Sequence, residues 1–214
     1  MAENLTETEV RVIGCLVEKQ LTTPEYYPLT LNALIAACNQ KSNRDPVVSY
    51  DETGATEALD SLRDKNLVYV FHGSTSRVVK YKHMLPSVYE LDPAETAVMT
   101  VLMLRGPQTV GEIRGRTDRL YDFESLGQVQ ETLDALARKD GPLAVKLERL
   151  PGQKDARYAH LLSGAVPDPI FSKPLANVAS KDDRITEIET ELKQLRNDLD
   201  ALRESVQEFR NQFS

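Results

Sequence analysis

Three arginines, Arg114, Arg116 and Arg119, lie close together in the stretch RGPQTVGEIRGRTDR. The planar donor fork of arginine matches phosphate oxygens and guanine edges, which it binds through two parallel hydrogen bonds. Gln128 follows shortly afterwards and adds a neutral side chain that both donates and accepts hydrogen bonds. The chemistry that these residue types and spacings favour is therefore contact with DNA.

Basic residues suited to the same role also lie around two predicted hairpins and before a helix in the first half of the chain. The candidate DNA contacts are Lys41, Arg44, Arg77, Lys80, Lys82, Arg114, Arg116, Arg119, Gln128, Lys154 and Arg157. The formal net charge of −7 opposes general coating of DNA, because non-specific affinity comes mainly from Lys and Arg on phosphates. A local basic face can still bind DNA, since affinity depends on the electrostatic potential at the contact surface and not on the net charge of the chain.

Catalytic chemistry has little support in the pattern of reactive residues. His72, His83 and His160 fall in or beside predicted strands, without Cys or carboxylate neighbours at the spacing of metal ligands. Cys15 and Cys38 lie among apolar helical residues, outside any C-x-x-C pattern, and are interpreted as reduced core thiols. The glycines of RGPQTVGEIRGRT match no phosphate-binding loop. We expect no enzymatic activity, no cofactor and no metal.

The elements that must position these residues occur twice. The first helix of each half opens with a predicted capping box, formed by Thr6 and Glu9 in one half and by Asp92 and Glu95 in the other. Pro93 takes the first helical position, where its missing N–H costs nothing. Apolar residues then recur at helical spacing in both halves.

Each opening helix leads into a short second helix, a third helix and a β-hairpin. The predicted ranges are 30–40, 56–68, 67–71 and 77–85 in the first half, and 109–117, 129–145, 143–150 and 156–162 in the second. Three helices and a hairpin are the elements of a winged helix-turn-helix domain. The expected class is mainly α with small β-hairpins (α+β). The expected domains are residues 1–86 and 87–164.

Long stretches of both halves resemble the YceH family of bacterial proteins. They are EVRVIGCLVEKQLTTPEYYPLTLNALIAACNQKSNRDPV, LMLRGPQTVGEIRGRT and PGQKDARYAHLLSG, and the match runs from about Leu5 to Gly164. The resemblance implies tandem winged-helix domains, in agreement with the repeat. It implies no activity and no functional residue, because the family is uncharacterised.

The composition changes after the second hairpin. Residues 165–180 read as a proline-containing linker, and residues 181–214 show a heptad repeat typical of a coiled coil. The core positions that would form a dimer are Ile185, Ile188, Leu192, Leu195, Leu199, Leu202, Val206 and Phe209. Charges beside this seam favour a parallel homodimer, and the alternative is a helix folded back on its own domains.

Two classes of function remain open. One is a DNA-associated regulator that contacts double-stranded DNA through the second domain and the hairpin tips. The other is an adaptor that docks an unidentified protein on acidic winged-helix surfaces, because the third helix of the first half carries Asp60 and Asp64 among other carboxylates. The start of the chain lacks the pattern of a signal peptide, and no apolar run is long enough to cross a membrane. We therefore expect a cytoplasmic protein.

Overall fold

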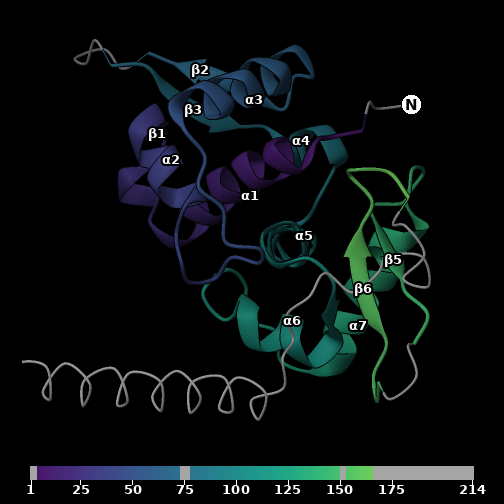
Figure 1. The fold of residues 1–214 in the computed structure, drawn as a ribbon. Coiled ribbons are helices and arrows are strands. Elements are labelled where there is room, and N and C mark those ends of the chain that lie inside the picture. The colour runs from purple at the N-terminus through teal and green to yellow at the C-terminus, as the bar shows by residue number, and fades with distance from the viewer. Residues whose placement is uncertain (1–3, 73–77, 150–152, 166–214) are drawn as a thin grey trace, which may run out of the picture. The chain divides into compact units, whose positions relative to one another are not determined.

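The computed structural model describes residues 4–72, 78–149 and 153–165. In those ranges the chain forms seven α-helices, one short 3-10 helix and two small antiparallel sheets (Figure 1). The mixed α+β class is confirmed. Arg77, the linker beyond residue 165 and the predicted coiled coil of residues 181–214 lie outside the described residues.

The first half runs through three helices and three strands. They are α1 (Glu7–Thr22), the 3-10 helix η1 (Pro24–Tyr26), β1 (Leu29–Thr30), α2 (Leu31–Cys38), α3 (Glu52–Asp64), β2 (Val68–Phe71) and β3 (Lys80–His83). The strands form one sheet in the order β1-β3-β2. The two-residue strand β1, which the sequence analysis did not predict, places Leu29 opposite Tyr81.

The second half repeats this order after the short helix α4 (Leu85–Tyr89). Its elements are α5 (Pro93–Arg105), β4 (Gln108–Thr109), α6 (Val110–Thr117), α7 (Leu126–Arg138), β5 (Ala144–Lys146) and β6 (Arg157–His160). The strands again form a sheet in the order β4-β6-β5. Gln108 lies opposite Tyr158, as Leu29 lies opposite Tyr81. The two halves that repeat in the sequence therefore also form sheets with the same strand order.

Both predicted capping boxes are confirmed. The backbone N–H of Glu9 donates to the Thr6 hydroxyl, and the Glu9 carboxylate accepts from the Thr6 N–H; Asp92 and Glu95 form the same pair of bonds. These bonds satisfy N–H groups that have no partner within the helix. Both helices therefore begin where the sequence predicts.

The third helix of the first half lies four residues earlier than predicted. It begins at Glu52 because the side chain of Asp51 accepts the Gly54 N–H at 2.8 Å, which makes Asp51 the cap. It ends at Asp64, and Asn66 then adopts a left-handed φ of 59° that turns the chain toward β2. The sequence signal for this helix start is Asp51, an N-cap residue in a loop that has no hydrophobic pattern.

An equivalent ion pair links the first and third helices in each half. The capping-box residue Glu9 accepts Lys65, which follows α3, at 2.7 Å, and Glu95 accepts Lys139, which follows α7, at 3.1 Å. Both carboxylates are largely buried. Each pair joins the start of the first helix to the end of the third. The two halves therefore use one local design twice.

The halves share a core that passes through α1 and α5 (Figure 1). Residues 9–17 and 95–104 are continuously buried, because each helix packs on its own half and on the other helix. Gly14 makes the close approach possible, since a Cβ there would lie 3.0 Å from Leu104 Cδ2. The N–H of Asp45 also donates to the Leu104 carbonyl at 2.9 Å.

The two cysteines lie in this core, as predicted. Cys15 and Cys38 are free and buried. Tyr27 packs against the core while Tyr26 is exposed. None of the helices in the described part of the chain combines the length and apolar character needed to cross a membrane.

Candidate anion-binding surfaces

Arg44, predicted to contact DNA, is instead buried, and we therefore exclude it from the contact surface. Its side chain is fully enclosed, and its guanidinium donates to both carboxylate oxygens of Glu18 at 2.9 and 2.6 Å. It also donates to the Ala37 carbonyl at 3.1 and 3.0 Å. Burial acts to lower the pKa of Arg44, but the bonds to Glu18 outweigh it and raise the pKa. Arg44 thus anchors the loop after α2 to α1.

Arg157 also serves an internal contact. It donates to the carboxylate of Glu112 at 2.9 Å and to the Pro107 carbonyl at 2.8 Å, which joins β6 to the start of α6. Burial would raise the pKa of Glu112, but the Thr109 N–H and the charge of Arg157 hold it below its usual value. Arg116 lies 3.8 Å from the same carboxylate. Glu112 therefore neutralises part of the basic cluster predicted on α6.

Arg114 and Gln128 order the loop between α6 and α7. Arg114 donates to the carbonyls of Phe123 and Glu124 at 3.2 and 3.1 Å. Gln128 accepts the Glu124 N–H at 3.0 Å and donates to the Tyr121 hydroxyl at 3.4 Å. Of the three clustered arginines on α6 and the turn after it, only Arg116 and Arg119 line the central cleft described below.

The basic residues of the first hairpin are only partly available. Lys80 and Lys82 are half-buried on β3, opposite Phe71 and Tyr69 of β2. Tyr81, between them, packs against the core. Since Arg77 lies outside the described residues, the structure assigns it no place.

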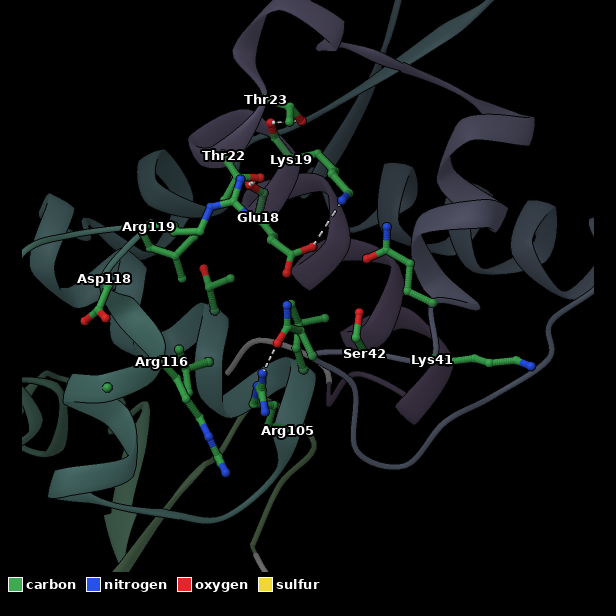
Figure 2. A pocket seen from close by; sticks show the side chains of 17 residues that line it. Glu18, Lys19, Thr22, Thr23, Lys41, Ser42, Arg105, Arg116, Asp118 and Arg119 are labelled. Atoms are coloured by element: carbon green, nitrogen blue, oxygen red, sulfur yellow. Dashed lines mark hydrogen bonds and ion pairs between the residues drawn. The ribbon is translucent and has the colours of Figure 1, made fainter.

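A cleft of ≈ 690 Å³, here called the central cleft, lies between the two halves (Figure 2). Its walls come from the end of α1, the loop after α2, the second half of α5, and α6 with the turn that follows it. The charged residues that line it are Glu18, Lys19, Lys41, Arg105, Arg116, Asp118 and Arg119. Five of these are basic and two acidic, so the lining is positive although the chain carries −7.

Arg105 is one of the cleft's cations that no described carboxylate pairs with. Its guanidinium donates to the side-chain oxygen of Asn43, and in the described ranges no carboxylate forms an ion pair with it. Burial, with the nearby charges of Arg116 and Arg44, lowers its pKa. Positive charges that repel one another in a partly desolvated recess favour a bound anion.

The other side chains shape the cleft around Arg105. Figure 2 shows Arg119 extending toward Thr22 on the opposite wall, whereas the ammonium group of Lys41 turns outward at the rim. The Glu18 carboxylate is held by Arg44 and lies 3.8 Å from Lys19, so its charge is largely balanced. Val101, buried in α5, adds an apolar wall.

A second hollow of ≈ 420 Å³ lies beside the second hairpin and is here called the wing hollow. Its lining includes Thr109, Val110, Gly111, Leu126, Gln130, Lys146, Arg149, Lys154, Asp155, Ala156 and Tyr158. Three lysine or arginine residues therefore meet one carboxylate, next to the first turns of α6 and α7. The backbone N–H groups of a first helical turn attract anions.

Only part of each surface could be predicted from the sequence. Lys19 and Arg105 in the central cleft, and Lys146 and Arg149 in the wing hollow, were not predicted. The alternation in LAVKLERL places Lys146 two residues after Ala144, on the same face of β5, but that face was not recognised as part of a site. Within the described residues, no group of three or more His, Cys, Asp or Glu side chains is placed to hold a metal ion.

Comparisons with known proteins place the chain among bacterial relatives. The family described as "Protein of unknown function, DUF480" matches residues 5–153. A UPF0502 protein of Opitutus terrae is 60% identical over 163 residues, which cover 76% of this chain and 71% of that protein. UPF0502 proteins of Pelobacter propionicus and Geotalea uraniireducens are each 46% identical, over 98% and 100% of both chains respectively. These two similarities extend beyond the second hairpin.

Proposed function

This chain belongs to the family described as "Protein of unknown function, DUF480", and we propose that it is a tandem winged-helix protein that binds double-stranded DNA. It has no enzymatic role in this proposal. The contact surface is the wing hollow of the second half. The observation that carries the proposal is the meeting of Lys146, Arg149 and Lys154 beside the first turn of α7.

The order of elements supports the winged-helix assignment. Each half has a long first helix, a short second helix, a third helix and a two-stranded hairpin that pairs with a short strand before the second helix. In DNA-binding proteins of this kind, the third helix enters the major groove and the hairpin contacts the backbone. The wing hollow lies between these two elements, where a phosphate group would be placed.

The charges on α7 indicate which part of DNA is read. Gln130 lines the hollow, and its amide is bonded to the Tyr158 hydroxyl and to Asp134. Glu131 and Asp134 are exposed farther along the helix and would repel phosphates. Contact is therefore dominated by the backbone phosphates near the start of α7, and sequence preference is weak.

The test is fluorescence anisotropy of a labelled mixed-sequence duplex with the full chain at several salt concentrations. Contacts to about three phosphates give a slope of log K against log salt near about −3. Lys154→Gln and Arg149→Gln should each weaken binding and reduce the slope by about one. Arg63→Gln, which removes an exposed charge on α3, is the matched control. Absence of binding at low salt, or equal loss in all three variants, contradicts the proposal.

A docking adaptor is the second candidate, favoured by the exposed surface of the first half. Tyr69 and Phe71 on β2 are 49% and 41% exposed, and Val79 beside β3 is 37% exposed. Large apolar side chains gathered on one hairpin are typical of protein contact surfaces. Exposed carboxylates on α3, among them Asp60 and Asp64, would favour a basic partner. Charge reversal at Asp60 and Asp64 should weaken binding of a basic protein partner if this surface docks one, and should leave DNA binding unchanged.

The proposal includes a parallel homodimer formed by residues 181–214. The continuous heptad of apolar residues supports it, and so do the opposite charges beside the seam. A dimer would present two wing hollows to one duplex, which strengthens binding through effective concentration.

A further inference from the structure

The central cleft has the size of a small-molecule site. Its volume of ≈ 690 Å³ lies within the range of pockets that bury most of a ligand's surface. The first half supplies Lys19 and Lys41, and the second half supplies Arg105, Arg116 and Arg119. A ligand there would touch elements far apart in the chain.

The donors of the cleft suit phosphate groups. Arg105 is held in place by Asn43 and forms no ion pair with a carboxylate in the described ranges. Arg119, which no described residue binds through a hydrogen bond or an ion pair, reaches toward Thr22 across the recess (Figure 2). Two guanidinium groups from different elements therefore line the same cleft, where each can hold a separate phosphate group of one ligand.

The remaining lining indicates more than a single inorganic ion. Lys19 adds charge on the wall formed by α1, and Ser42 adds a hydroxyl on the loop after α2. Val101 and Leu104 are buried apolar residues on the α5 wall, and Leu120 adds a half-buried side chain after α6. An apolar or aromatic group packed on this wall would bring an attached phosphate chain toward Arg105.

The balance of charge selects a ligand with several negative charges. Glu18 is already paired with Arg44 and lies near Lys19, and Asp118 is exposed. The two carboxylates therefore offset little of the charge of Arg105 and Arg119, whereas Arg116 is partly balanced by Glu112. One phosphate would leave much of this charge uncompensated, whereas a chain of phosphates would match it.

We infer that the central cleft binds a phosphorylated small molecule of nucleotide size, with its phosphates on Arg105 and Arg119 and its apolar group against α5. This inference does not depend on DNA binding, because the cleft and the wing hollow have no lining residue in common. Binding would bridge the two halves of the chain.

The experiment is isothermal titration calorimetry of the full chain with inorganic pyrophosphate and with ATP, each without divalent cations. Both probes should bind, and ATP more tightly because it also covers the α5 wall. Arg105→Gln and Arg119→Gln should each weaken binding about tenfold, the loss expected for one charged hydrogen bond. Because Arg119 is exposed in a turn, its replacement tests the site even if Arg105→Gln fails to fold.

Lys154→Gln is the control that separates the two surfaces. It should weaken DNA binding and leave ATP binding unchanged, whereas Arg119→Gln should do the reverse. The inference is overturned if neither probe binds at millimolar concentration, or if Arg105→Gln and Arg119→Gln bind as the unchanged chain does. Loss of DNA binding in Arg119→Gln without any ATP binding would identify the cleft as a DNA contact instead.

Discussion

Replacement of Glu18 by Gln removes the carboxylate that neutralises a buried guanidinium. The side chain of Arg44 is fully enclosed, and that of Glu18 is 13% exposed. In Glu18→Gln the amide oxygen can still accept one bond, and the Ala37 and Asn43 carbonyls continue to accept others. The hydrogen bonds are largely kept while the opposing charge is lost.

The loss of stability in Glu18→Gln is therefore set mainly by the unpaired charge of Arg44. An uncompensated buried charge costs about 3–5 kcal/mol, and we expect about 3 kcal/mol here because several hydrogen bonds remain. For a protein of this size, that loss lowers Tm by roughly 6–12 °C. Arg44→Met should cost a similar amount, because it leaves the Ala37 carbonyl without its donor. Glu18 and Arg44 interact directly, so their effects should not add. The double variant should lose less unfolding free energy than the sum of the two single losses, and the difference should exceed about 1 kcal/mol.

Urea unfolding followed by near-UV circular dichroism measures these costs. All eight tyrosines lie between Tyr26 and Tyr158, so the tyrosine band of this signal reports on the two repeats. Asp60→Asn, which breaks the exposed pair with Arg63, is the control and should cost less than about 1 kcal/mol. Additive costs in the double variant, or no loss in Glu18→Gln, would refute the assignment of Arg44 as a buried anchor.

Two further predictions concern acid stability and assembly. Burial lowers the pKa of both His83 and His160 to about 4 from 6.5, with the charge of Lys82 adding to the effect at His83. The unfolded chain therefore takes up protons below pH 6.5 that the folded chain excludes. Stability is complete above that pH and is lost as pH falls toward 4, by about 2–3 kcal/mol between pH 7 and 5.5. Urea unfolding at both pH values should show this loss, and replacing both histidines with Phe should flatten it; an unchanged profile would exclude them as the cause. Sedimentation equilibrium should give twice the 24.0 kDa chain mass, with Leu195→Asp returning the monomer and the control Gln194→Asp retaining the dimer. A monomeric unchanged chain would exclude the coiled-coil dimer.

Features that depend on residues close in sequence could be predicted. The capping boxes at Thr6 and Asp92 join residues three apart, so the pattern contains both partners. The first helices and the order of the repeat followed from them. The strands β1 and β4 were missed, because two-residue strands have no periodicity and form only when the hairpin provides a partner.

The sites depend on contacts between distant residues. Arg44 was predicted to be exposed because its partner Glu18 lies 26 positions earlier, on another helix. Arg114, Arg116 and Arg119 read as one cluster in the sequence, but the helix and its turn direct them to different neighbours. Lys19 and Arg105 meet in the central cleft only because α1 packs against α5. No local pattern contains that information.

Because α1 packs against α5, the two similar halves of this one chain are joined as the two subunits of a homodimer would be. A protein assembled from two identical subunits must carry every surface in duplicate, so a change that suits one partner alters both copies. Here the equivalent helices of two linked copies meet through Gly14 and Leu104, and evolution can modify each copy separately around one shared core. The acidic face of α3 and the basic wing hollow are the kind of divergence that this covalent linkage permits.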